Sequence, residues 1–116
     1  MRGRPALQAL GRLPPGTMNK TEAAYAAFLD TLVQCGDVIW YRFEGYKLRL
    51  ADNTFYSPDF AVMRATGHLE MHEVKGHWQD DARVKIKVAA SQYPHPFLAV
   101  HQLPKKAGGG WKVERF

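Results

Sequence analysis

The hydrophobic and polar positions between residues 19 and 34 follow the spacing of a helix with one buried face. Asn19 or Thr21 can cap the start of this helix, and Gly36 is placed to end it. The sequence therefore predicts an amphipathic helix over 19–34. Its apolar positions, spaced i, i+3, i+4, i+7 and i+8, are Tyr25, Phe28, Leu29, Leu32 and Val33.

The positions after residue 37 alternate in the manner of β-strands. Segments rich in β-branched and aromatic residues are separated by turn residues at 52–53 and 65–67. We expect three or four strands in this block, so that a strand-rich region follows the first helix. The segments with strand character are 38–43, 47–50, 59–63 and 69–75.

The pattern after residue 79 allows two interpretations. Val84, Ile86 and Val88 alternate as in a strand, but the apolar residues from 82 to 93 also fit helical spacing. The length of the segment and the aspartates at its start favour a helix that ends at Pro94. A fully buried strand at 97–100, parallel to its neighbour across the helix, and a last strand at 111–113 complete an α/β fold.

Length and composition indicate one soluble domain. The chain has 116 residues, of which 46% are hydrophobic and 23% charged, and no apolar run is long enough to span a membrane. Residues 1–17 are expected to be a flexible basic arm, or an N-terminal tail with no role, and 18–116 the domain. The single cysteine, Cys35, is predicted to be a buried packing residue in a reducing, cytoplasmic compartment.

The net charge of +5 indicates a polyanion partner, and nucleic acid is the commonest one. Arg83 and Lys87 are one helical turn apart, and with Lys85 between them they are candidate phosphate contacts, although a solvated helix face is the alternative. His77 is a candidate for a substrate or proton-transfer role, or a plain loop histidine. Trp78 is a candidate for base stacking or for hydrophobic anchoring. The basic residues that follow position 82 are Arg83, Lys85, Lys87, Lys105, Lys106, Lys112 and Arg115.

Two acidic residues and a lysine lie on the predicted strands in a pattern that brings them together. Glu73 and Lys75 are two residues apart, so both side chains project from one face. Asp59 lies opposite Glu73 if the turn is centred on Thr66, which makes 65–67 a three-residue loop. Gly67 then occupies the left-handed position that such loops favour, whereas a one-residue slip would separate the two carboxylates.

Glu22 lies in the first turn of the predicted helix, on or near its apolar stripe. It is either a residue that caps the helix and complements its dipole or a third acid beside Asp59 and Glu73. Two or three hard oxygen ligands suit Mg²⁺, with Mn²⁺ as the expected substitute. A lysine beside such an ion can orient a water or stabilise charge on phosphorus, which suits phosphodiester hydrolysis.

These residues form a recognisable motif. The Ser-Pro-Asp sequence at 57–59, a gap of 13 residues and the Glu-Val-Lys sequence at 73–75 resemble the PD-(D/E)XK nuclease signature. Over about residues 19–103 the chain is similar to small phage-encoded endonucleases related to the Holliday-junction resolvases. The segments that carry this wider resemblance are 20–25, 56–60, 73–76, 83–87 and 93–94.

The resemblance implies a restriction-endonuclease-like core in the order α-β-β-β-α-β. Asp59, Glu73 and the Val74 carbonyl would be metal ligands, Glu22 the helix-borne acid and Lys75 the catalytic lysine. It implies a magnesium-dependent enzyme that cuts DNA, branched DNA in particular, as a homodimer in the cytoplasm of a bacterial host. A solvated surface hairpin, a non-cleaving nucleic-acid-binding module and a nuclease subunit of a larger restriction or transposition assembly are the alternatives.

Overall fold

The computed structural model describes residues 16–76 and 80–116. The expected basic arm therefore lies outside the described residues except for its last two positions, and so do His77 and Trp78. The elements in chain order are α2 (Lys20–Gln34), β1 (Val38–Phe43), β2 (Leu48–Ala51), β3 (Thr54–Tyr56), β4 (Phe60–Arg64), β5 (Leu69–Lys75), α3 (Asp80–Gln92), β6 (Phe97–Gln102), a short 3-10 helix η1 (Lys105–Ala107) and β7 (Trp111–Arg115).

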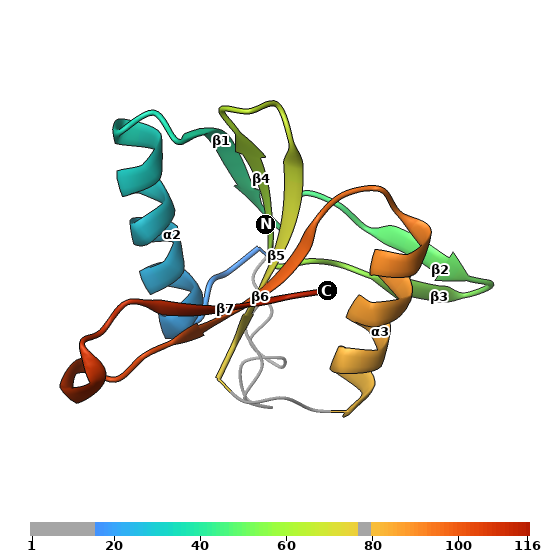
Figure 1. Ribbon diagram of the computed structural model, residues 1–116. Coiled ribbons are helices and arrows are strands. Elements are labelled where there is room, and N and C mark those ends of the chain that lie inside the picture. The colour runs from blue at the N-terminus through green and yellow to red at the C-terminus, as the bar shows by residue number, and fades with distance from the viewer. Residues whose placement is uncertain (1–15, 77–79) are drawn as a thin grey trace.

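A five-stranded mixed sheet in the order β1-β4-β5-β6-β7 forms the centre of the molecule (Figure 1). β5 and β6 are parallel and are joined through α3, while the other neighbouring pairs are antiparallel. α2 lies on one side of the sheet, and α3 lies on the other with the β2–β3 hairpin (Figure 1). The α/β class and the parallel placement of the buried strand after α3 are thus confirmed.

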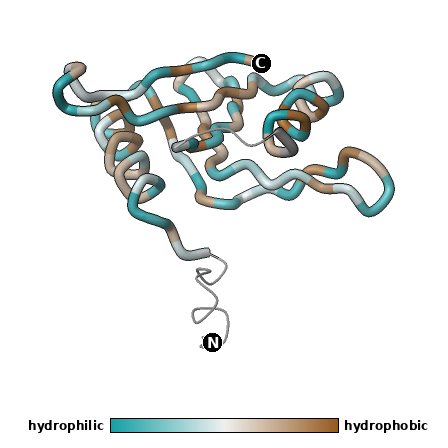
Figure 2. Tube along the Cα trace, turned by 90° about the horizontal axis from the view of Figure 1, so that it is seen from below, coloured by the Kyte–Doolittle hydropathy of each residue, from teal (hydrophilic) through white to brown (hydrophobic). Residues whose placement is uncertain are grey.

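Each face of the sheet has its own hydrophobic core, because successive side chains of a strand point to opposite faces. Figure 2 shows the apolar segments on both helices and along the strands between them. The core under α2 contains Tyr25, Leu29, Phe60, Val62 and Val74. The core under α3 and the hairpin contains Leu48, Tyr56, Met71, Ile86 and Phe97.

Helix α2 departs from the sequence prediction at its outer residues. The prediction of one apolar stripe is right for Tyr25 and Leu29, but Phe28 and Val33 are 37% and 38% exposed. The prediction of a buried Cys35 is wrong, because this residue forms the exposed C-cap beyond the last turn. The sheet covers a narrower strip of the helix than the apolar pattern provides, so the flanking side chains stay at the surface.

The second half of the chain resolves the ambiguity between helix and strand. Residues 80–92 form α3, in which Ile86 and Ala89 are fully buried while Val84 is 57% exposed, as helical spacing requires. β3 was not expected as a separate strand; it pairs with β2 across a turn at 52–53. None of the described helices is long and apolar enough to cross a membrane.

Candidate active site

The β4–β5 hairpin has the register that the turn chemistry predicts. Phe60 pairs with His72 and Met63 with Leu69, so the hairpin is centred on Thr66. Gly67 adopts a left-handed φ of 92°, and its N–H donates to the Arg64 carbonyl at 2.9 Å. The positions that follow outward from the last pair are residues 59 and 73, and the register therefore places the two acids opposite each other.

Backbone contacts fix Asp59 at the end of β4. Its carboxylate accepts a hydrogen bond from the Val74 N–H at 2.8 Å, next to Glu73 in the chain. Its carbonyl accepts a second hydrogen bond from the Glu44 N–H, also at 2.8 Å. The carboxylate is thus held against the strand that carries the other acid.

Glu73 is 8% exposed and makes two polar contacts on the α3 side of the sheet. The Lys75 ammonium nitrogen lies 3.0 Å from Glu73 Oε2, and the Tyr56 hydroxyl donates to Oε1 at 2.8 Å. The sequence analysis did not single out Tyr56. The alternation of 54–56 after the turn at 52–53 could have indicated it as the inward residue of a short strand.

The electrostatics of the pair favour an added cation. Burial, together with the nearby charges of Glu73 and Glu22, raises the pKa of Asp59 from 3.8 to about 8. The Val74 hydrogen bond and Lys75 oppose this rise without cancelling it. Burial and the Glu73 charge also raise the pKa of Tyr56, which keeps its hydroxyl protonated as a donor. A divalent cation bound between Asp59 and Glu73 would offset the repulsion between the two carboxylates, and oxygen ligands of this kind suit a hard ion.

Glu22 takes the capping role that the sequence analysis left open. Its N–H donates to Asn19 Oδ1 and its carboxylate accepts from the Asn19 N–H, both at 2.8 Å, which makes a capping box. α2 covers the sheet face opposite to Glu73, so the charge of Glu22 reaches Asp59 without joining the pair. Among residues 16–76 and 80–116, no three acidic, histidine or cysteine side chains are grouped to hold a metal ion.

No family model, curated protein or solved structure matches this chain. The interpretation of the site therefore depends on its residues and their geometry. Val74 contributes its N–H to Asp59 and buries its side chain under α2, and a role of its carbonyl as a ligand stays a prediction.

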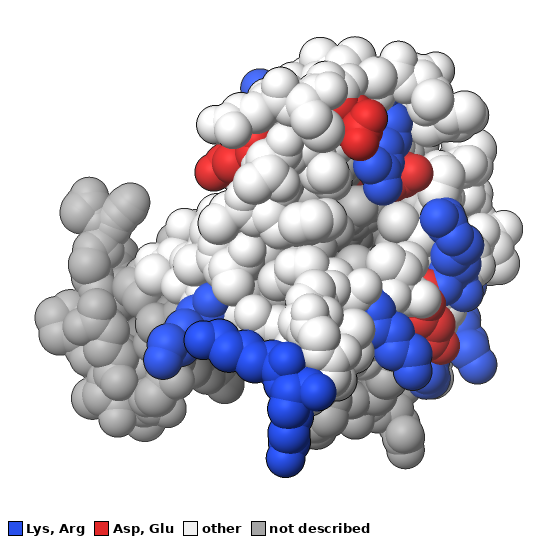
Figure 3. Space-filling model, turned by 60° about the vertical axis from the view of Figure 1, so that its left-hand side comes forward, with Lys and Arg blue, Asp and Glu red and all other residues white. Residues whose placement is uncertain are grey.

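The candidate DNA contacts on α3 have different surroundings. Arg83 makes a two-pronged ion pair with Glu114, at 2.7 and 3.3 Å, and lies 5.6 Å over the Phe116 ring. Arg83 thereby ties α3 to β7, whereas Lys85 and Lys87 are exposed. Figure 3 shows that Lys and Arg side chains gather along the lower part of one face of the molecule.

The β2–β3 hairpin carries a basic and an aromatic residue that the sequence analysis did not assign to DNA contact, Arg49 and Phe55. Arg49 pairs across the hairpin with Phe55, which is 39% exposed, and the Lys47 ammonium lies 4.6 Å from the Phe55 ring centroid. The Tyr93 hydroxyl donates to the Arg49 carbonyl at 2.6 Å and holds the hairpin to α3. Tyr56 of the same hairpin contacts Glu73 from the inner face, whereas Arg49 and Phe55 lie on the outer face of the hairpin.

Proposed function

We propose that this protein is a magnesium-dependent DNA endonuclease whose reaction centre is formed by Asp59, Glu73 and Lys75. The single observation that carries the proposal is the hairpin register, which sets Asp59 opposite Glu73 and lets its carboxylate accept from the Val74 N–H. A partly buried acid pair next to a lysine, in a basic protein, is a donor set that suits phosphodiester hydrolysis.

The order of elements supports a restriction-endonuclease-like core. α2, β1, β4, β5, α3 and β6 follow the sequence α-β-β-β-α-β, with the β2–β3 hairpin inserted between β1 and β4. In this interpretation β7 extends the sheet beyond the core. The acid pair then lies where β4 begins and β5 approaches its end.

Asp59 and Glu73 would hold the Mg²⁺ ion, because magnesium is commonly bound through one or two carboxylates and completed by water and phosphate. When bound, the ion supplies an acidified water and offsets the charge that develops on the phosphate oxygens. Tyr56 orients Glu73 through its hydroxyl. Lys75 holds a positive charge 3.0 Å from Glu73, where it can donate to an attacking water or to a phosphate oxygen.

DNA is the substrate that the surface supports best. Lys47, Arg49 and Phe55 combine cations for phosphates with a ring for stacking, on the outer face of the hairpin whose inner residue Tyr56 contacts Glu73. We further propose that the substrate is branched DNA and that the protein acts in the cytoplasm. A homodimer would allow two sites to cut opposing strands.

A non-cleaving nucleic-acid-binding module is the second candidate. The observation in its favour is the Lys75–Glu73 ion pair, which already neutralises one carboxylate. Incubation of supercoiled plasmid and of a four-way junction with Mg²⁺ or EDTA separates the two functions. We expect nicking in Mg²⁺ and none in EDTA. Glu73→Gln should abolish the nicking, whereas Asp37→Asn, which makes the same charge change at an exposed residue, should retain it. Binding without nicking at high protein concentration supports the module instead.

A matched pair of variants separates the two roles of Glu22. Glu22→Gln keeps an acceptor for the Asn19 N–H but removes the charge near Asp59. Asn19→Ala removes the cap acceptor without a change in charge and should lower stability by about 1 kcal/mol. If Glu22 assists the metal, only Glu22→Gln loses cleavage. If Glu22 is a cap alone, Glu22→Gln cuts at the wild-type rate.

A further inference from the structure

A cavity of about 280 Å³ lies on the sheet face opposite to the acid pair, beside α2. His72 borders it, whereas the neighbouring Met71 packs in the core under α3, because successive side chains of β5 alternate. Phe28 of α2 and Trp111 and Val113 of β7 form apolar walls. Phe28 and Val113 are 37% and 48% exposed, so the cavity opens to solvent between the helix and the edge of the sheet.

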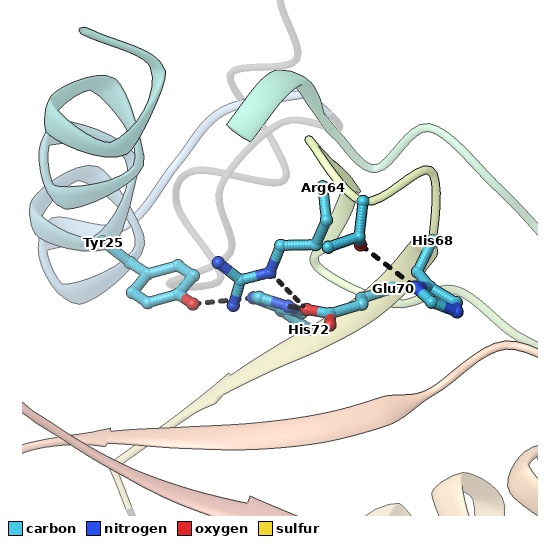
Figure 4. Close-up of polar contacts among 6 residues, drawn as sticks. Tyr25, Arg64, His68, Glu70 and His72 are labelled. Carbon is cyan, nitrogen blue, oxygen red and sulfur yellow. Dashed lines mark hydrogen bonds and ion pairs between the residues drawn. The ribbon is translucent and has the colours of Figure 1, made fainter. Parts of the chain in front are cut away.

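A chain of hydrogen bonds forms the polar side of this cavity (Figure 4). The Tyr25 hydroxyl lies 2.6 Å from His72 Nδ1, and His72 Nε2 lies 2.8 Å from Glu70 Oε1. Since a carboxylate can only accept, Nε2 carries the proton and Nδ1 accepts from Tyr25. Glu70 Oε1 also accepts from Arg64 Nε at 3.0 Å. Glu70 therefore fixes both the imidazole and the guanidinium.

Two guanidinium groups border the cavity. Arg64 is anchored through Nε, and Figure 4 shows its terminal nitrogens directed away from Glu70 toward Tyr25. Arg115 lines the same cavity, and both arginines also line an adjoining hollow of about 360 Å³ together with Asp37 and Glu70. A preorganised guanidinium with a second one nearby is the arrangement that binds phosphate groups, because the planar fork matches the oxygens.

We propose that this cavity binds a nucleotide, with its phosphate on Arg64 and Arg115 and its base against Trp111 and Phe28. The volume lies near the lower end of small-ligand sites, about 300 Å³, which suits one nucleotide. Trp111 packs edge-to-face on Tyr25 with ring centroids 4.8 Å apart, so its ring is held in place for stacking. The nucleotide is either free or part of a single strand, and both present the same phosphate and base.

Calorimetric titration in EDTA tests binding without metal or cleavage, so a positive result does not require an active acid pair. The ligands are thymidine 5′-monophosphate, inorganic phosphate and hexathymidylate. We expect the mononucleotide or the oligonucleotide to bind at least about tenfold more tightly than phosphate, the gain expected from one stacked base. The tighter of the two identifies the source of the nucleotide. The proposal is overturned if phosphate and both nucleotide ligands bind with equal affinity. It is also overturned if neither the mononucleotide nor the oligonucleotide binds.

Two basic residues of β7 that line different hollows provide a matched variant and control. Arg115→Glu reverses the charge in the cavity, whereas Lys112→Glu makes the same change on the other face, near Arg83. Arg115→Glu should weaken nucleotide binding by about tenfold to a hundredfold, the effect of losing a hydrogen bond between charged groups. Lys112→Glu should leave it unchanged. Arg115→Gln, which removes the charge without reversing it, should show an intermediate loss. Equal losses in both glutamate variants overturn the assignment to this cavity.

Discussion

Asp59→Asn perturbs the acid pair with the least change of shape. The asparagine oxygen can still accept the 2.8 Å hydrogen bond from the Val74 N–H, so the end of β4 stays anchored. The variant removes the carboxylate that the pair needs for a cation, and we expect it to abolish metal-dependent cleavage. It also removes a carboxyl group whose charged form is disfavoured in the folded protein, and we therefore expect the metal-free variant to be more stable than the wild type at neutral and alkaline pH.

The pKa of Asp59 sets the sign and size of this effect. Burial first, and then the Glu73 charge, raise the pKa of the folded protein from 3.8 to about 8. Between these values the folded state holds a proton that the unfolded state has released, so the Asp59 contribution to stability falls as pH rises. The slope is at most about 1.4 kcal/mol per pH unit. The stability of Asp59→Asn relative to wild type should thus rise by up to about 3 kcal/mol from about pH 5 to about pH 7.

Urea unfolding in EDTA at three pH values in this range measures the difference directly. Asp37→Asn, at an exposed position, should show no such trend. Addition of Mg²⁺ at about pH 8 should stabilise the wild type, because the ion binds the folded state, and should not stabilise Asp59→Asn. If the difference in free energy of unfolding between wild type and Asp59→Asn does not change across this pH range, the pKa of Asp59 is not raised and the electrostatic support for a cation site is lost.

Further predictions concern the residues around the two sites. Glu70→Ala leaves His72 and Arg64 without their shared acceptor and should lower the free energy of unfolding by about 2–4 kcal/mol, measured by urea unfolding. Tyr56→Phe should slow cleavage about tenfold while lowering stability by only about 1 kcal/mol; wild-type cleavage would show that the hydroxyl does not position Glu73. Burial keeps the pKa of His72 below 6.5, so the unfolded state binds the proton first and stability should fall as pH drops below about 6.5. His72→Gln should lose that part of the pH dependence in the same unfolding assay.

The parts of the fold that the sequence predicted are those governed by local geometry. The register of β4 and β5 follows from a three-residue loop, a left-handed glycine and the alternation of the strands, all within 59–75. The bounds of β1 and β5 agree with the predicted segments 38–43 and 69–75 for the same reason. Asp59 and Glu73 lie within this one hairpin, so their meeting followed from local rules.

The parts that it did not predict depend on which surfaces meet. Helical spacing shows that Phe28 and Val33 share a side with Leu29, but the core under α2 does not include them, and both stay exposed. Alternation along β5 places His72 on the opposite face from Glu73. It does not reveal that Tyr25 of α2 and Arg64 of β4 meet there to complete a polar network.

Glu22 shows where a motif and a fold give different information. An acid in the first turn of a helix suits a cap and suits a ligand equally well, because both roles use an exposed carboxylate near a helix start. The capping box uses the carboxylate of Glu22 on Asn19, and the packing of α2 places the helix across the sheet from Glu73. The charge of Glu22 still contributes to the raised pKa of Asp59, so the helix and the acid pair are coupled without contact. A cation bound by Asp59 and Glu73 would relieve the repulsion from both glutamates, and Glu22 can therefore strengthen metal binding while it remains a cap.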